Sequence, residues 1–223
     1  MLLAAGRGER LRPLTDTSPK ALVEVNGESL LERHLRQLSA AGVSNVVINT
    51  GWLGEQIVER IGSGRQYGLQ VAYSPEYERL LETGGGVYRA LPLLGPEPFW
   101  VVNADIVCDR PFAAPALPDG IDAFLMLVPN PDYRSTGDFN LEAGRVRNGT
   151  ELPYTFSGIA CYRPRFFADC APGRFGLAPM LQKAADEGRL SGEVYEGLWA
   201  DIGTPERLAA LNKRLQQAGS DDA

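Results

Sequence analysis

Residues 1–15 read MLLAAGRGERLRPLT, and this stretch predicts how the chain begins to fold. Met1–Ala5 is a short apolar run typical of a buried strand, and a loop rich in Gly and Arg follows it directly. Gly6 and Gly8 lack a Cβ, so the backbone there can turn tightly and expose N–H groups, which suits phosphate oxygens. The stretch therefore predicts a strand that leads into a loop able to bind an anion.

The loop differs from the two best-known phosphate-binding motifs. No Gly-Lys-Ser/Thr closes it, as a Walker A loop requires, and Leu11 stands where a dinucleotide fingerprint has its third glycine. A Gly-x-Gly after a strand is a weak signal by itself, but the local charge strengthens it. The first twenty residues carry the cations Arg7, Arg10, Arg12 and Lys20 against the acids Glu9 and Asp16.

The charge of the whole chain has the opposite sign. Its 223 residues include 22 Lys+Arg and 28 Asp+Glu, a formal net charge of −6. Duplex DNA and anionic membranes need a basic face, so we expect neither nucleic acid nor membrane as a partner. Among the basic residues only Lys20, Lys183 and Lys213 are lysines, and a lysine is a compact point charge where arginine is a planar fork. Lys20 therefore stands out, although a plain surface lysine is the alternative.

Beyond the loop, apolar strands alternate with helices. We expect helices over residues 29–41, 55–61 and 84–94, and strands over 45–50, 69–74 and 99–103. Strand–helix–strand order implies right-handed crossovers. The fold class is therefore expected to be α/β, with three layers in a Rossmann-like arrangement and a mainly parallel, mixed central sheet.

After residue 110 the pattern changes to longer loops that contain Gly and Pro. We expect strands over 123–128, 154–162 and 193–199 and a helix over 177–187. A last helix has an explicit start, with Thr204 as N-cap, Pro205 at N1 and Glu206 in the first turn, and should end near Gln217. We expect one domain over residues 1–223 with a substrate-binding region in its second half.

The single histidine excludes several kinds of site. His34 shares one helical face with Leu30 and Leu38, so a packing role is expected. A metal site of several histidines is impossible, and a Ser-His-Asp triad on this residue is improbable.

The cysteines, Cys108, Cys161 and Cys170, are odd in number and form no CxxC pair. This pattern favours free thiols in a reducing cytoplasm over a disulfide scaffold or a zinc site. No stretch of about 20 apolar residues occurs, so no membrane span is expected.

Two aspartates end apolar strands, where ligands bind in open α/β sheets. Asp105 follows the strand over 99–103 within Asn103-Ala104-Asp105, and Asp201 precedes the last helix. Each could be a turn or capping residue. If the fold brings them together, two carboxylates beside several cations suit Mg2+-assisted chemistry on a phosphate.

Several motifs together resemble a known family. They are LAAGRGERLRPLT at 3–15, Pro19-Lys20, LETGGG at 81–86, Asn-Ala-Asp at 103–105, YTFSGI at 154–159 and WADIGTP at 199–205. Over nearly the whole chain, the sequence resembles the sugar-phosphate nucleotidylyltransferases, also called nucleotide-diphosphosugar pyrophosphorylases. Within that family it is most similar to members that act on N-acetylmuramate 1-phosphate.

The resemblance implies an activity. A uridylyl group would pass from UTP to a sugar 1-phosphate, giving a UDP-sugar and pyrophosphate, with Mg2+ as cofactor and N-acetylmuramate 1-phosphate as the expected sugar, in recycling of the bacterial cell wall (peptidoglycan). The alternatives are glucose, mannose or heptose 1-phosphate as the sugar, dTTP as the nucleotide, or a non-catalytic nucleotide-sensing subunit of the same fold. A kinase is disfavoured because no Walker motif is present. The oligomeric state could be a monomer or a small homo-oligomer.

The resemblance also implies roles for residues. The expected catalytic residues are Arg10, Lys20 and Asp105, and the expected Mg2+ ligands are Asp105 and Asp201. The expected nucleotide-binding residues are Ala4, Ala5, Gly6, Gly8, Glu9, Arg10, Lys20, Glu82, Thr83, Gly84, Gly85 and Asn103. The expected sugar-binding residues are Gly137, Asp138, Asn140, Glu151, Thr155 and Ser157, each of which could equally serve a turn or a sheet edge. Residues 1–110 would form the nucleotide-binding half and residues 111–223 the sugar-binding half.

The sequence departs from the family pattern in one important place. Many members carry a second lysine, in a Glu-Lys-Pro segment, that meets the sugar phosphate, and the comparable stretch over 145–151 has none. Arg145, Arg147 or a second Mg2+ are the candidates to replace it. The acetyltransferase extension of some relatives is also absent, so acetyl transfer is not expected.

Overall fold

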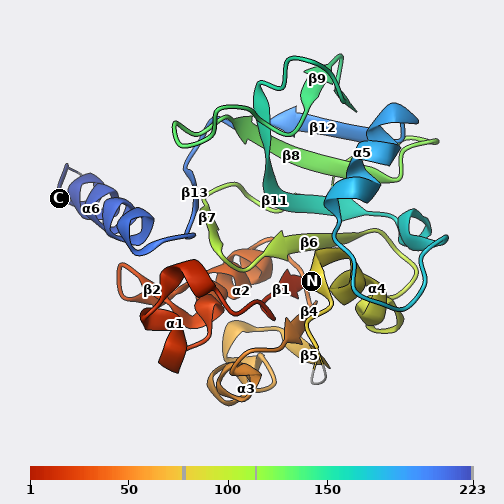
Figure 1. Ribbon diagram of the computed structural model, residues 1–223. Coiled ribbons are helices and arrows are strands. Elements are labelled where there is room, and N and C mark those ends of the chain that lie inside the picture. The colour runs from red at the N-terminus through yellow and green to blue at the C-terminus, as the bar shows by residue number, and fades with distance from the viewer. Residues whose placement is uncertain (77–78, 114, 222–223) are drawn as a thin grey trace. The chain divides into compact units, whose positions relative to one another are not determined.

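The computed structural model describes residues 1–76, 79–113 and 115–221 (Figure 1). The chain forms two compact units, each assembled from separate segments. The N-terminal unit comprises Leu2–Leu80, Asn103–Phe112 and Ala200–Ala223, and the C-terminal unit comprises Met1, Leu81–Val102 and Ala113–Trp199. Each unit has its own strands and its own core, so each is described by itself.

Three parallel strands form the centre of the N-terminal unit. They are β1 (Leu2–Leu3), β4 (Asn45–Thr50) and β5 (Gln70–Pro75), with β4 in the middle. Leu2 pairs with Ile48, and Asn49 pairs with Ser74. Every residue of β4 after Asn45 is buried, as expected of a β-branched strand covered on both faces.

The two main helices of the N-terminal unit cover these strands through one apolar face each. Helix α2 (Leu30–Ala40) begins at Ser29, whose side chain accepts a hydrogen bond from the Glu32 N–H. It buries Leu30, Leu31, His34, Leu35 and Leu38, so His34 is a packing residue as predicted. Helix α3 (Gly54–Ile61) buries Ile57 and Ile61.

Short elements and one long helix, α6 (Pro205–Asp221), complete the N-terminal unit. The short elements are η1 (Glu9–Leu11), α1 (Leu14–Thr17), η2 (Lys20–Leu22), β2 (Glu24–Val25), β3 (Glu28–Ser29), η3 (Arg65–Tyr67) and β7 (Ile106–Cys108). Helix α6 is attached through Asn212, whose side-chain oxygen accepts from the Asn26 N–H at 2.7 Å. None of the 3-10 helices has a hydrophobic period long enough to be predicted from the sequence.

The C-terminal unit is a mixed sheet in the order β6–β11–β8–β12–β10–β9. The strands are β6 (Phe99–Asn103), β8 (Ala123–Pro129), β9 (Asn140–Glu142), β10 (Arg145–Arg147), β11 (Tyr154–Tyr162) and β12 (Leu190–Val194). Strand β11 is antiparallel to β6 and β8, and β12 is parallel to β8. Mixed pairing of this kind, with helices against the strands, belongs to the α/β class.

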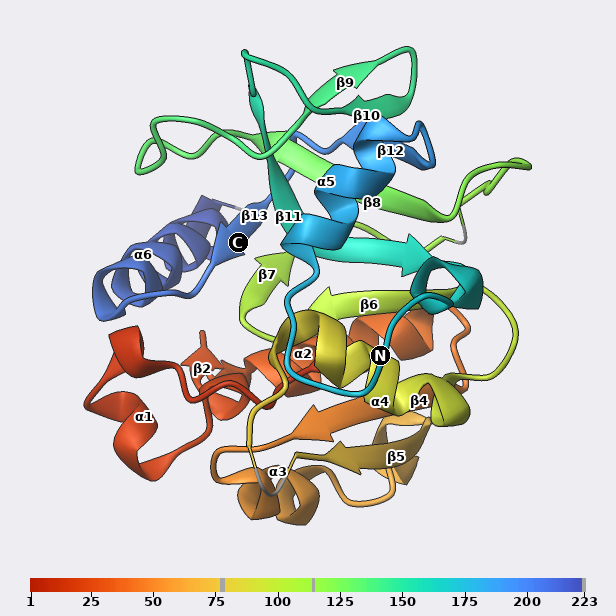
Figure 2. The same ribbon diagram turned by 45° about the vertical axis from the view of Figure 1, so that its right-hand side comes forward.

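Helices and aromatic side chains complete the C-terminal unit. Helix α4 (Glu82–Leu94) opens it, a turn of 3-10 helix, η4 (Pro164–Phe167), follows β11, and α5 (Ala178–Asp186) lies across β10 and β12 (Figure 2). The core includes an aromatic cluster in which the Tyr162 ring lies 5.0 Å from Phe166 and 5.5 Å from Phe167, between ring centroids.

Most predicted elements are confirmed, and the strands over 45–50, 99–103 and 154–162 are found with the predicted bounds. The first strand is shorter than predicted, because Ala4 donates its N–H to the side chain of Asn49 instead of to a neighbouring strand. The last helix begins at the predicted Thr204 cap, whose hydroxyl accepts from the Arg207 N–H, but it runs past Gln217 to Asp221.

The single strand predicted over 193–199 is wrong. Strand β12 ends at Val194, and a separate strand, β13 (Trp199–Asp201), pairs with β7. Between them the chain folds over the Tyr195 side chain, since a Cβ on Gly197 would lie 2.2 Å from the tyrosine hydroxyl. The apolar residues of this stretch therefore serve two different sheets.

All three cysteines are free, as predicted. Within the described residues, the structure contains no helix with the length and apolar character needed to span a bilayer.

Candidate active site

The loop after β1 is shaped by close contact with Lys20. Gly8 has a φ of +69°, and a Cβ there would lie 3.0 Å from the Lys20 side chain, so glycine is required on both counts. The loop is anchored by the fully buried Leu11. Among the described residues, none accepts a hydrogen bond from the backbone N–H of Gly6, Arg7 or Gly8. The loop therefore presents consecutive backbone donors, which is the form of an anion-binding nest.

A buried polar pair supports the start of this loop. Asn49 accepts from the Ala4 N–H at 2.7 Å and donates to a carboxylate oxygen of Glu76 at 2.8 Å. Both side chains are almost fully buried. Burial without a partner would be unfavourable for either group, so the pair fixes the position at which the chain leaves β1. A polar residue within an otherwise buried strand was the signal for this contact, and sequence reasoning missed it.

Lys20 forms an ion pair with Asp105 in the N-terminal unit. The Lys20 ammonium lies 2.5 Å from Asp105 Oδ2, and the lysine side chain is only 14% exposed. Lys20 is therefore not a free surface lysine, and its role in catalysis stays a prediction. Burial lowers the pKa of His34 to about 4, against weaker raising effects of the Ile106 backbone and of the Asp105 charge, so this histidine is neutral at pH 7.

The fold brings Asp201 to the same place. The Ile202 N–H donates to the Asp105 carbonyl at 2.7 Å, so the two aspartate segments run side by side. Arg207 donates to Asp201 Oδ2 at 2.5 Å. A Cβ on Gly203 would lie 3.1 Å from Asp201 Oδ2 and 3.3 Å from Arg10 Nη2, so the missing side chain leaves room for both groups.

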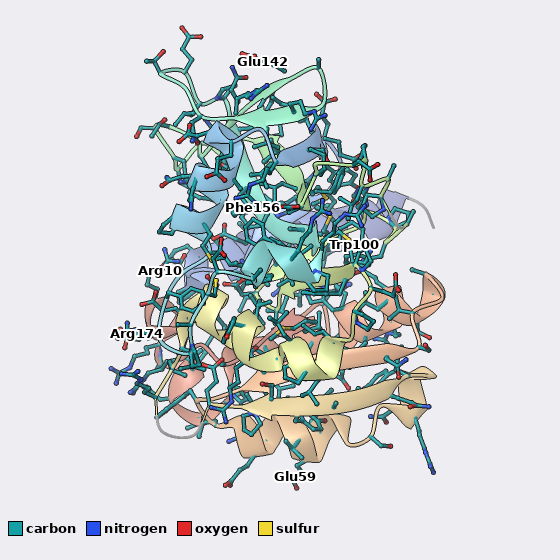
Figure 3. All side chains as sticks on the ribbon, turned by 90° about the vertical axis from the view of Figure 1, so that its right-hand side faces the viewer. Arg10, Glu59, Trp100, Glu142, Phe156 and Arg174 are labelled. Carbon is teal, nitrogen blue, oxygen red and sulfur yellow. The ribbon has the colours of Figure 1, made fainter. Side chains whose placement is uncertain are left out.

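Arg10 itself lies on η1 and is exposed (Figure 3). The N-terminal unit thus assembles Arg10, Lys20, Asp105 and Asp201 around the Gly-rich loop. Asn103, at the end of β6, opens the segment that carries Asp105.

These carboxylates fit a magnesium ion that arrives with a phosphate. Within the described chain there is no group of three or more His, Cys, Asp or Glu side chains that could hold a metal. Mg2+ is commonly bound by one or two carboxylates together with substrate phosphates and waters, so Asp105 and Asp201 are compatible with such a site, and their role as ligands stays a prediction. Each carboxylate is neutralised by a basic side chain in this structure, Asp105 by Lys20 and Asp201 by Arg207.

The glycine run at the start of α4 packs against the segment over 173–177 of the same unit. A Cβ on Gly84 would lie 2.5 Å from the Phe175 ring, and one on Gly85 would lie 2.2 Å from the Gly173 carbonyl oxygen. The Gly85 N–H donates to the Phe175 carbonyl at 2.9 Å. Close packing therefore explains both glycines without a ligand, and their role in nucleotide binding stays a prediction.

The two polar residues before these glycines are held by the same segment. Glu82 has a φ of +61°, and its carboxylate accepts from Arg174 Nε at 2.8 Å. The Thr83 hydroxyl accepts from the Leu177 N–H at 2.9 Å. A positive φ in a residue other than glycine costs about 1–3 kcal/mol and is common where function requires a fixed side chain. Sequence reasoning missed this segment because 92 and 94 residues separate the partners of these two contacts.

Most of the predicted sugar-binding residues use their hydrogen bonds within the C-terminal unit. Asp138 accepts from Arg134 at 2.8 and 2.9 Å and from the Phe156 N–H at 2.9 Å. The Ser157 hydroxyl donates to the Met126 carbonyl at 2.7 Å, and the Thr155 hydroxyl donates to the Asn130 side chain at 2.9 Å.

Two of the predicted sugar-binding residues instead line an open cavity. Asn140 and Glu151 border a cavity of about 360 Å3 in the C-terminal unit. Its other lining residues are Ser135, Thr136, Thr150, Leu152 and Pro153. Gly137 lies nearby in the chain but has no space beside it, since a Cβ would lie 2.3 Å from the Asn130 side chain.

Arg145 and Arg147, the two arginines that could replace the sugar-phosphate lysine of other family members, lie at the two ends of β10. Arg145 donates to the Gly188 carbonyl at 3.3 Å, and both arginine side chains are partly exposed.

Comparison with known proteins defines the class. The chain belongs to the nucleotidyl transferase family, whose model matches residues 1–119. The family expected from the sequence motifs is therefore confirmed, and this is a family of enzymes.

Individual relatives narrow the class further. The chain is 47% identical over 219 residues to N-acetylmuramate alpha-1-phosphate uridylyltransferase of Neisseria meningitidis serogroup B, covering 93% of this chain and 94% of the relative. It is 36% identical over 234 residues to the Caulobacter vibrioides protein of the same name, covering 98% and 97%.

The fold agrees with this assignment. A solved UDP-glucose pyrophosphorylase complexed with UDP-glucose superposes with a TM-score of 0.77 at 18% identity, covering 97% of each chain. The three-layer Rossmann-like nucleotide-diphosphosugar transferase fold predicted from the sequence is thereby confirmed.

Proposed function

We propose that this protein transfers a uridylyl group from UTP to N-acetylmuramate 1-phosphate and releases pyrophosphate, with Mg2+ as cofactor. The observation that carries the proposal is the convergence of Arg10, Lys20, Asp105 and Asp201 on a loop with free backbone donors. The choice of UTP and of this sugar rests on the relatives that share 47% and 36% of the sequence. Cytoplasmic recycling of peptidoglycan is the role that such a product would serve.

The reaction is a displacement at phosphorus. An oxygen of the sugar 1-phosphate forms a bond to the α-phosphorus of UTP, and the bond from that phosphorus to the pyrophosphate oxygen breaks. The attacking phosphate is already ionised at neutral pH, so no general base is needed. The protein therefore contributes by positioning the two substrates and by stabilising charge.

The loop supplies most of the phosphate contacts in this proposal. The backbone N–H groups of Gly6 and Gly8 bind phosphate oxygens, with Ala4, Ala5 and Glu9 shaping the surrounding surface. Arg10 stabilises the charge that develops on the departing pyrophosphate. Lys20, as a compact point charge, lies between the α-phosphate and the attacking phosphate.

Asp105 and Asp201 would hold the magnesium ion. When bound, Mg2+ supplies positive charge that offsets the repulsion between the phosphates of the two substrates. Asp105 also holds Lys20 in place before the substrates bind, as their 2.5 Å contact indicates.

The remaining predicted residues form the specific part of the site. Glu82, Thr83, Gly84, Gly85 and Asn103 contact the base and ribose, and the strained Glu82 supports this role. Asn140 and Glu151 contact the sugar from the 360 Å3 cavity. In this division residues 1–110 serve the nucleotide and residues 111–223 serve the sugar, within one catalytic domain.

The test is pyrophosphate release across a matrix of nucleoside triphosphates and sugar 1-phosphates, with Mg2+ or with EDTA. UTP with N-acetylmuramate 1-phosphate should give the highest kcat/KM, and EDTA should abolish the reaction. Preference for glucose, mannose or heptose 1-phosphate would replace the sugar in the proposal. Absence of turnover with every pair, in a folded protein that still binds UTP, would favour a nucleotide-sensing subunit instead.

A further inference from the structure

Arg7 is held differently from Lys20 and Arg12, two basic neighbours in the N-terminal segment. Lys20 is paired with Asp105, and Arg12 is paired with Asp16. Arg7 has no ion pair within the part of the chain that the structure describes, and its guanidinium carbon lies instead 4.1 Å from the centre of the Trp52 ring. An aromatic face attracts a cation without neutralising its charge, so Arg7 keeps a full positive charge available for an anion.

Trp52 is fixed to the loop at both ends. Its backbone N–H donates to the Ala5 carbonyl at 3.2 Å, and its indole N–H donates to the Thr15 carbonyl at 2.9 Å. Thr15 is fully buried and donates its hydroxyl to the Gly8 carbonyl at 2.9 Å. The tryptophan therefore bridges the two ends of the segment over residues 5–15 and cannot rotate without breaking these contacts.

The residue before Trp52 permits this close approach. A Cβ on Gly51 would lie 2.6 Å from the Ala5 carbonyl oxygen, so only glycine allows the two backbones to meet here. The ring face is thus presented to Arg7 by backbone geometry as well as by hydrogen bonds.

One N–H group of the Arg7 side chain has no acceptor among the described residues. This group, at Nε, is buried from solvent and has no hydrogen-bond partner in that part of the chain. A buried donor without an acceptor is unfavourable, and a bound ligand, ion or water is one way to satisfy it. In the same part of the chain the backbone N–H groups of residues 6–8 have no protein acceptor either, so one loop carries an unneutralised guanidinium beside a row of open donors.

We infer that Arg7 binds the phosphates of the nucleoside triphosphate and that Trp52 is the residue that positions it. This inference rests on the proposed function, because it adds a contact to the same phosphate site. The guanidinium lies over the indole ring, which holds the side chain in place and leaves its charge open to an anion on the loop. Arg7 then acts on nucleotide binding and not on the sugar phosphate.

The test measures binding before turnover. Isothermal titration calorimetry with UTP and Mg2+, and separately with inorganic tripolyphosphate, compares wild type, Arg7→Ala and Arg65→Ala. Arg65 is an exposed arginine of the same unit, and its removal changes the net charge equally. Arg7→Ala should weaken both ligands by about tenfold or more, the usual effect of losing a charged hydrogen bond, whereas Arg65→Ala should match wild type.

The role of Trp52 is tested with one variant that lacks an aromatic ring and one that keeps it. Trp52→Leu removes the ring face and should weaken UTP binding about as much as Arg7→Ala, while Trp52→Phe keeps a face and should restore most of the affinity. The double variant Arg7→Ala/Trp52→Leu should bind no worse than Arg7→Ala alone, because the tryptophan acts through the arginine. A merely structural role would instead lower the melting temperature and add to the effect of Arg7→Ala.

Steady-state kinetics separate this inference from the proposed function. Arg7→Ala should raise KM for UTP and leave KM for the sugar 1-phosphate unchanged. Affinity of Arg7→Ala equal to that of Arg65→Ala, in a protein that still turns over UTP, would overturn the role of Arg7 and leave the proposed function intact. A wild-type protein that neither binds UTP nor releases pyrophosphate would overturn both.

Discussion

The loop after β1 carries polar groups, and so does the part of the C-terminal unit that was predicted to bind the sugar. The polar groups of these two regions are held in different ways. In the loop, the backbone N–H groups of residues 6–8 and the Nε of Arg7 have no acceptor in the described structure. On the sugar side, Asp138, Thr155 and Ser157 are bonded to their own unit. Donors without a protein acceptor are open to a ligand or to water, whereas the bonds of Asp138, Thr155 and Ser157 already serve the fold. A polar residue in a motif can therefore serve the fold, a ligand or both, as the paired Lys20 and Asp105 illustrate.

The largest effect is expected at Asp105, one of the two proposed Mg2+ ligands. Asp105→Ala should lower kcat by a factor on the order of a hundred or more, as for loss of a group that stabilises charge in a transition state. Pyrophosphate release at saturating Mg2+ measures it, with a melting curve to show that the fold is intact. Wild-type release from this variant would show that Asp105 does not hold the metal.

A smaller loss is expected when Lys20 keeps its charge but changes its shape. Lys20→Arg should lower kcat about tenfold, because a planar fork cannot replace a point charge beside two phosphates and in contact with Asp105. The same pyrophosphate assay measures the loss. Full activity would show that the reaction does not need a point charge at this position, and would leave Lys20 with a structural role in the ion pair with Asp105.

A substitution at Ser157, on β11, should change the stability of the protein. Ser157→Ala leaves the Met126 carbonyl, which is buried, without its donor, so the free energy of unfolding should fall by about 1–3 kcal/mol. Urea unfolding measures the change. An unchanged midpoint would mean that the hydroxyl is not needed by the fold, and the contrast between the two regions would weaken.

The smallest effect on the reaction is expected at Asn140, which borders the cavity of the C-terminal unit. Asn140→Ala should raise KM for the sugar 1-phosphate by about threefold to tenfold, the effect of one lost neutral hydrogen bond, with KM for UTP unchanged. Steady-state kinetics with each substrate varied in turn measure both constants. An equal rise in both would place Asn140 outside the sugar site.

The relation between motif and structure is clearest at the glycines. Gly8 was predicted to serve the loop, and its positive φ and contact with Lys20 agree with that role. Gly84 and Gly85 were predicted to read the base, yet the structure surrounds them with Phe175 and Gly173. A glycine in a sequence indicates that something comes close, but the sequence does not reveal whether it is a ligand or another part of the chain.

The sequence alone determined the features that depend on near neighbours. The buried strands over 45–50, 99–103 and 154–162 follow from unbroken apolar runs, and the last helix follows from its Thr204 cap. The basic Gly-rich loop was also readable, because its charge and its glycines lie within a few residues of each other.

Only the tertiary structure decided which distant residues meet. It brought Asp201 beside Asp105, Trp52 against Arg7, and Arg174 onto Glu82. The sequence also suggested one strand over 193–199 where two sheets share the residues. Hydrophobic periodicity reports the local environment of a segment, whereas contacts between segments depend on how the strands are ordered, which no local pattern records.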